Sequence, residues 1–148
     1  MPAIFFHELV VPTDAIDELG HVNNARYLVW LQDAAVAHSA ANGWPIERYR
    51  DLNAGWIARS HTIEYRQPAF AGDQLSIATW VSGVRKVASW RRYVVERQCD
   101  GARIVEAETK WAFVDFTEFR PRRVPATFWE DFEVLSDERA QALMNQAS

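Results

Sequence analysis

The sequence contains a single cysteine, Cys99, among 148 residues. One cysteine cannot form an intramolecular disulfide, and it cannot supply the thiolate cluster of a structural zinc site. Basic residues are also scarce, since 16 Lys and Arg stand against 20 Asp and Glu and the net charge is −4. A general nucleic-acid-binding role is therefore disfavoured, because such proteins present a basic face to the phosphates. An anionic ligand would need a local basic patch.

Long hydrophobic runs are missing as well. No stretch approaches the ~18 apolar residues of a membrane-spanning helix, and the first residues, MPAIFFHELVVP, lack the basic start of a signal peptide. The 4 histidines show neither HxxxH nor HxH spacing, so little supports a metal site. We therefore expect a cytoplasmic protein with one domain over residues 1–148, with no cofactor and no membrane partner.

Residues 25–41 carry the pattern of one long amphipathic helix of about 17 residues, or roughly 25 Å. Asn23 or Asn24 is suited to cap its start, and Asn42-Gly43 followed by Pro45 predicts its end. The residues of the buried stripe are expected to be Tyr27, Leu28, Leu31, Ala34, Ala35 and His38.

The remainder of the chain has the alternation and turn spacing of antiparallel strands. Strands are expected at residues 4–11, 57–65, 75–81, 87–97 and 102–116, with short helices near 127–132 and 136–146. One long helix beside five strands can bury its stripe only by lying across one face of the sheet, so we predict an α+β fold. Trp80, Trp90 and Trp111 cannot all pack around one helix. The outer face of the sheet should then be wet or covered by a second subunit.

The segment DELGHVNN, residues 17–24, immediately precedes the predicted helix. Free N–H groups and the positive end of the helix dipole converge at a helix N-terminus, where a developing oxyanion finds donors. A carboxylate slightly upstream, in a turn held by Gly20, would approach the same place, and acyl transfer requires this combination. The same residue types are also typical of ordinary turns and helix caps. The pattern alone leaves both interpretations open.

The motif DxxGHVNNxxY at residues 17–27, followed by Trp30, resembles hotdog-fold acyl-CoA thioesterases of the 4-hydroxybenzoyl-CoA thioesterase type. It is similar too to the HVNN segment of plant fatty acyl-ACP thioesterases. The resemblance continues through IEYRQPAFAGDQL, residues 63–75, and ends near RPRRVP, residues 120–125. It implies a hotdog fold, in which a five-stranded antiparallel sheet wraps around one long central helix, and hydrolysis of an acyl thioester.

By this resemblance, Asp17 matches the catalytic acid and the backbone N–H of Asn24 matches the oxyanion donor. His21 and Asn23 match positions with supporting roles, and Gly20 is expected to contact the substrate. Asp17 would act as a nucleophile or as a general base, and the sequence does not choose between these roles.

The chain also departs from the family patterns. Leu19 stands where the plant pattern has Asn, and the other hotdog branch has an HGG loop and a helix Glu that are absent here. The predicted helix offers only Asp33 on its polar side. Asp14 is more typical of a turn cap, and His38 of a buried structural histidine.

Two basic clusters are candidates for the coenzyme A phosphates. Arg85 and Lys86 lie in a predicted turn, where charge-assisted contacts with phosphates are expected, although such a turn is also typical of plain solvated surface. Ser89, just after the turn, is a further substrate-binding candidate. The second cluster consists of Arg120, Arg122 and Arg123.

The leading hypothesis is hydrolysis of an acyl-CoA or acyl-carrier-protein thioester by a homodimer or a dimer of dimers, with sites at the dimer interface. The alternative is a non-hydrolytic acyl-CoA-binding or sensing module on the same fold. A hydratase is less well supported, because the His and Asp pattern of such enzymes is not present in the sequence.

Overall fold

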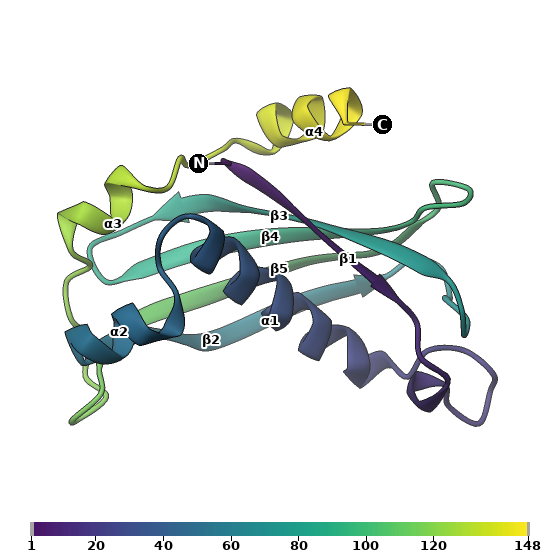
Figure 1. The fold of residues 1–148 in the computed structure, drawn as a ribbon, viewed down its shortest axis with the longest axis horizontal. Helices are drawn as coiled ribbons and strands as arrows, with labels where there is room; N and C mark the ends of the chain where they lie inside the picture. Colours follow the sequence, from purple (N-terminus) through teal and green to yellow (C-terminus); the bar gives the residue numbers. More distant parts are fainter. Residues whose placement is uncertain (1, 148) are drawn as a thin grey trace.

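A five-stranded antiparallel sheet with the order β1-β3-β4-β5-β2 carries a long helix, α1, on one face (Figure 1). The computed structural model describes residues 2–147. The strands are β1 (Ile4–Val10), β2 (Ala54–Tyr65), β3 (Gln74–Val84), β4 (Ala88–Arg97) and β5 (Arg103–Asp115). The helices are the short 3-10 helix η1 (Thr13–Ala15), α1 (Asn24–Ala41), α2 (Ile46–Leu52), α3 (Ala126–Glu130) and α4 (Asp137–Gln146). The predicted α+β architecture is confirmed.

Helix α1 begins where its local sequence predicts. Asn23 is the N-cap, and its side chain accepts a hydrogen bond of 2.9 Å from the Ala25 amide, which satisfies one of the free donors of the first turn. Trp30 is buried where Leu28 was expected, and Leu28 is only half-buried. The small side chains of Ala34 and Ala35 let the helix approach the sheet closely.

Helix α2 is not predicted by the sequence pattern, which marks Pro45 only as the end of α1. Pro45 is instead the N-cap of α2, with a φ of −70°. Pro12 caps the start of η1 in the same way, with a φ of −76°, because the proline ring fixes this angle. Because proline lacks an N–H and has a preset φ, it interrupts one helix and starts the next without leaving a donor unpaired.

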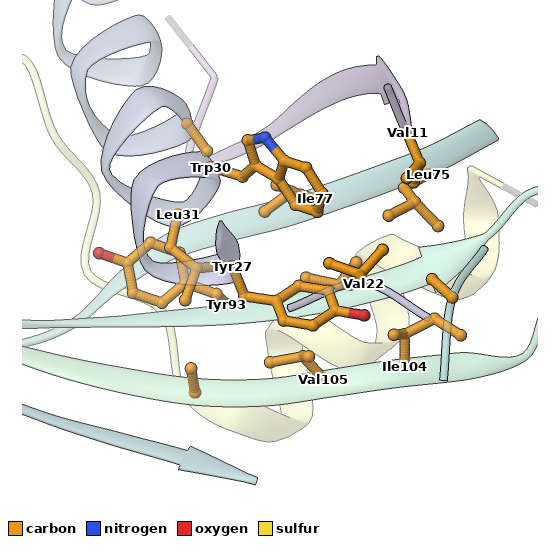
Figure 2. Close-up of a cluster of buried hydrophobic side chains, with 14 of the residues drawn as sticks. Val11, Val22, Tyr27, Trp30, Leu31, Leu75, Ile77, Tyr93, Ile104 and Val105 are labelled. Carbon is orange, nitrogen blue, oxygen red and sulfur yellow. The ribbon is translucent and has the colours of Figure 1, made fainter. Parts of the chain in front are cut away.

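The main core lies between α1 and the sheet (Figure 2). Tyr27, Trp30 and Leu31 project from α1 towards the side chains of the strands. The strand residues of this core include Leu75, Ile77, Tyr93, Ile104 and Val105. Burial of such large apolar side chains stabilises the fold by about 1.5–3 kcal/mol each, before the entropy of ordering is subtracted.

The outer face of the sheet is partly covered by the C-terminal segment of the same chain. Trp80 and Val94 pack there against Leu135, Ala140 and Met144, which lie on or just before α4. The expectation of a wet or subunit-covered outer face is therefore wrong for this region. Its physical reason is that α4, although short, buries an apolar side of its own on the sheet.

Candidate functional site

The segment from Ile16 to Val22 forms a tight loop closed by backbone hydrogen bonds. The Asp17 amide donates to the His21 carbonyl at 2.9 Å, and the Gly20 amide donates to the Asp17 carbonyl at 3.1 Å. Gly20 has a φ of 87°, a conformation that glycine adopts without a steric cost. The loop thus holds Asp17 in a defined place directly before α1.

The two carboxylate oxygens of Asp17 have different environments. Oδ1 accepts a hydrogen bond of 2.9 Å from the Leu19 amide, whereas Oδ2 lies 3.6 Å from Nδ1 of His21. The side chains are 26% exposed for Asp17 and 34% for His21, so both are accessible to a ligand. One oxygen therefore fixes the carboxylate, and the other remains available for chemistry.

The first turn of α1 supplies backbone donors beside this loop. The Ala25 amide is bonded by the Asn23 side chain, and the Arg26 amide donates to the Asn23 carbonyl at 3.0 Å. The amide of Asn24, the first residue of the helix, has no acceptor among residues 2–147. It is the free N–H group that an oxyanion would require.

Tyr65 reaches the same helix end from β2. Its hydroxyl donates a hydrogen bond of 3.1 Å to the Asn24 carbonyl, and its ring lies 5.7 Å from that of Tyr27. No role is predicted for Tyr65 from the sequence, although the residue lies in the IEYRQP segment that carries part of the family resemblance. The IEYRQP segment is therefore the sequence signal from which Tyr65 could have been identified.

Asp14 is held by an ion pair rather than directed into the loop. Its Oδ1 lies 3.4 Å from Nη2 of Arg26, so it links η1 to the first turn of α1. This contact agrees with its interpretation as a structural residue.

The structure places the two basic clusters far from Asp17 within one chain. At the end of the Asp17 loop, the Val22 amide donates a hydrogen bond to the carbonyl of Ala69, which lies shortly before the start of β3. Arg85 and Lys86 instead follow the end of β3. A strand of 11 residues spans about 36 Å. Asp17, Gly20, His21, Asn23 and Asn24 therefore lie together, and Arg85, Lys86 and Ser89 lie towards the other end of the sheet.

The second basic cluster is also at that other end. Nη1 of Arg122 donates to the Leu52 carbonyl at 3.0 Å, and Arg120 pairs with Glu118 at 3.0 Å. Neither cluster shares a site with Asp17 in a single chain.

His38 is fully buried and makes structural contacts. Its Nε2 lies 2.9 Å from the Pro2 carbonyl, and its ring stacks on Phe5 with centroids 5.5 Å apart. Burial, reinforced by the positive charge of Arg91, lowers the pKa of His38 to about 4. The histidine is therefore neutral at physiological pH, as expected for a structural residue.

Among residues 2–147, no three His, Cys, Asp or Glu side chains cluster closely enough to hold a metal ion. Over the same range, no helix is both long enough and apolar enough to cross a membrane.

Solved structures with the same architecture identify the fold. A 1,4-dihydroxy-2-naphthoyl-CoA thioesterase from Synechocystis superposes with a TM-score of 0.78 at 16% identity, covering 86% of this chain and 93% of that one. A DHNA-CoA thioesterase from Staphylococcus aureus gives a TM-score of 0.80 at 16% identity, over 98% of this chain and 95% of that one. A probable thioesterase from Escherichia coli gives a TM-score of 0.76 at 21% identity, covering 86% of this chain and 95% of that one. The fold is the hotdog fold of thioesterases.

The sequence itself identifies the family. The profile of the thioesterase-like superfamily matches residues 10–134, which include the Asp17 loop, α1 and the whole of β2 to β5. The chain belongs to the thioesterase-like superfamily. The search of curated protein sequences found no match.

Proposed function

We propose that the protein hydrolyses an acyl-CoA or acyl-carrier-protein thioester to a free acid and a thiol, with Asp17 carrying the chemistry. The observation that supports this most directly is the arrangement at the start of α1. A partly exposed carboxylate with one oxygen fixed by the Leu19 amide lies in the loop that leads to the free amide of Asn24. Membership of the thioesterase-like superfamily supports the same conclusion.

Two mechanisms are compatible with this geometry. As a nucleophile, Oδ2 of Asp17 attacks the thioester carbonyl carbon, the C–S bond breaks, and water then hydrolyses the resulting anhydride. As a general base, the carboxylate removes a proton from water, the water oxygen attacks the same carbon, and collapse of the adduct breaks the C–S bond. In both, the carbonyl oxygen becomes an oxyanion that the Asn24 N–H stabilises. Thiols have a pKa near about 8.5, so the leaving thiolate needs no strong general acid.

The proposed enzyme is a homodimer or a dimer of dimers. Edge strand β2 has 12 residues and is largely exposed from Ala58 to Thr62, and exposed edges of this length are normally covered. Val29 and Val36, 52% and 58% exposed, lie two turns apart on the outward side of α1. A second copy over β2 and α1 would cover both surfaces and bring a distant basic cluster towards the Asp17 loop.

Release of free thiol from a panel of acyl-CoAs tests the proposal. Short, long and aromatic acyl groups belong in the panel, since one of the similar structures is described as a 1,4-dihydroxy-2-naphthoyl-CoA thioesterase. Turnover that depends on Asp17 supports hydrolysis. Binding of acyl-CoA without thiol release by the wild-type protein would favour the acyl-CoA-binding module instead.

A further inference from the structure

A small cavity of about 150 Å³ lies at the C-terminal half of α1. Ala35, Val36 and Ser39 of α1 form one side, and these positions are roughly 17 to 22 Å along the helix from Asn24. A cavity of this size has room for about one six-membered ring, since engineered apolar cavities of about 150 Å³ bind benzene. Most of the remaining wall is aromatic, formed by Trp44, Tyr49, Trp56, Trp111, Phe116 and Phe128.

Arg91 of β4 lines this aromatic cavity and is only 7% exposed. It is the only arginine, lysine or carboxylate residue among the buried side chains of residues 2–147. Its Nη1 donates to Nδ1 of His38 at 2.9 Å and to Oγ1 of Thr79 at 3.1 Å. Nε and Nη2 have no acceptor, and no carboxylate pairs with the guanidinium, within the described part of the chain.

The two partners of Arg91 orient its guanidinium without neutralising it. His38 accepts through Nδ1 while its Nε2–H donates to the Pro2 carbonyl, which is the hydrogen-bonding pattern of a neutral imidazole. Thr79 donates its own hydroxyl proton to the Arg92 carbonyl at 2.9 Å and accepts from Arg91. A buried cation without a counter-ion costs free energy, and a bound anion would offset that cost.

A second polar group lies on the same wall. Ser89 is two residues before Arg91 on β4, so both side chains point to the same face of the sheet. Ser89 is buried and lines the cavity, and its hydroxyl makes no hydrogen bond within residues 2–147. The cavity therefore presents one cation, one free hydroxyl and an aromatic surface.

We propose that this cavity binds a compact carboxylate with a ring-sized apolar body, held by Nε and Nη2 of Arg91. These two nitrogens lie on one edge of the guanidinium, so they can donate two parallel hydrogen bonds to one carboxylate. The aromatic walls bury the apolar body, and Ser89 contributes a further hydrogen bond. The carboxylate belongs either to a free acid or to the far end of an acyl group whose thioester is elsewhere.

Calorimetric titration of the wild-type protein with benzoate and with benzamide tests the proposal. The two molecules have almost the same shape, but only benzoate carries a charge. We expect benzoate to bind about tenfold to a hundredfold more tightly, the ratio typical of charge-assisted hydrogen bonds. Equal binding of the two molecules, or no binding of benzoate, would overturn the proposal.

Variants at two adjacent arginines provide the matched comparison. Arg91→Met should abolish the preference for benzoate over benzamide, because the apolar body still fits and the anion has no partner. Arg92→Met should keep the preference, since Arg92 lies on the other face of β4 and pairs with Glu108 and Asp137. If Arg91→Met does not fold, the comparison of the two ligands on the wild-type protein still decides the matter.

Inhibition of thioester hydrolysis distinguishes the two sources of the carboxylate. If benzoate inhibits hydrolysis competitively and Arg91→Met removes this inhibition, the cavity binds the far end of the acyl group. Binding of benzoate with unchanged hydrolysis assigns it to a free acid. The calorimetric result does not depend on catalysis, so absence of hydrolysis would refute the proposed function and leave the carboxylate site to be judged by its own titration.

Discussion

Oδ2 of Asp17 and Nδ1 of His21, four positions apart in the chain, lie 3.6 Å from each other, while the other oxygen of Asp17 is fixed by the Leu19 amide. The spacing places an imidazole beside the one carboxylate oxygen that is free to react. The pair thus forms a compact unit at the start of α1, built entirely from local sequence.

Asp17→Asn should lower kcat by something on the order of a hundredfold to ten-thousandfold, the usual effect of losing a general base. Asparagine keeps an oxygen that can accept from the Leu19 amide, so the loop should fold as before. The measurement is steady-state thiol release together with acyl-CoA binding, which should be retained.

Asp14→Asn is the internal control for this substitution. Asp14 is paired with Arg26, so its loss should leave kcat nearly unchanged. If Asp14→Asn abolishes turnover and Asp17→Asn does not, the assignment of the catalytic acid is wrong. If Asp17 has only a turn-forming role, Asp17→Asn should leave turnover intact, whereas Asp17→Ala, which removes the acceptor for the Leu19 amide, should cost about 1 kcal/mol of unfolding free energy, as for a cap.

Replacement of Arg85 and Lys86 by alanine should raise KM for acyl-CoA by about fivefold to thirtyfold, which corresponds to about 1–2 kcal/mol. Contacts far from the reacting carbonyl stabilise ground and transition states equally, so kcat should change little. The wild-type KM should also rise with salt, because exposed charges are screened. An unchanged KM in the double variant would show that Arg85 and Lys86 do not bind the phosphates. The next candidates would then be Arg120, Arg122 and Arg123.

Light scattering at micromolar concentration should report a particle with the mass of two or four chains. Val29→Glu, on the exposed side of α1, should shift the particle towards a single chain, because a buried carboxylate disfavours the interface. Val10→Glu lies at the β1 edge of the sheet and should leave the mass unchanged. A wild-type particle of 17.0 kDa would refute the dimer and the shared site.

Unfolding free energy should decrease as the pH falls from about 6.5 to about 4, by up to about 3 kcal/mol. Burial lowers the pKa of His38 from 6.5 to about 4 in the folded protein. Between pH 4 and 6.5 the unfolded chain therefore binds more protons than the folded protein does. The contribution is fully present above pH 6.5 and is lost progressively below it. Chemical denaturation across this range measures the slope.

His38→Asn isolates this effect. The asparagine oxygen can still accept from Arg91, but the side chain does not titrate, so the slope between pH 4 and 6.5 should flatten. Equal slopes in the wild type and in His38→Asn would contradict the assignment to His38.

Local sequence was sufficient to predict much of the fold and the position of the Asp17 loop before α1. The helix cap at Asn23, the Gly20 turn and the position of Asp17 involve residues only a few positions apart, so short-range hydrogen bonding and backbone preferences specify them. The strands follow from alternation and turn spacing in the same way. The 3-10 helix, α2 and the exact strand ends depend on packing that such patterns do not encode.

Only the tertiary structure brings His38 beside Arg91, across 53 positions of the chain. The meeting depends on the register of β3 and β4 and on the angle at which α1 crosses them, and neither is set by a local pattern. The same register places Arg85 and Lys86 at the opposite end of the sheet from Asp17. The sequence by itself therefore determined which residues begin the helix and form the turn, because those interactions are local. The long-range packing of α1 on the sheet decided where the buried charge lies and which candidates share a site.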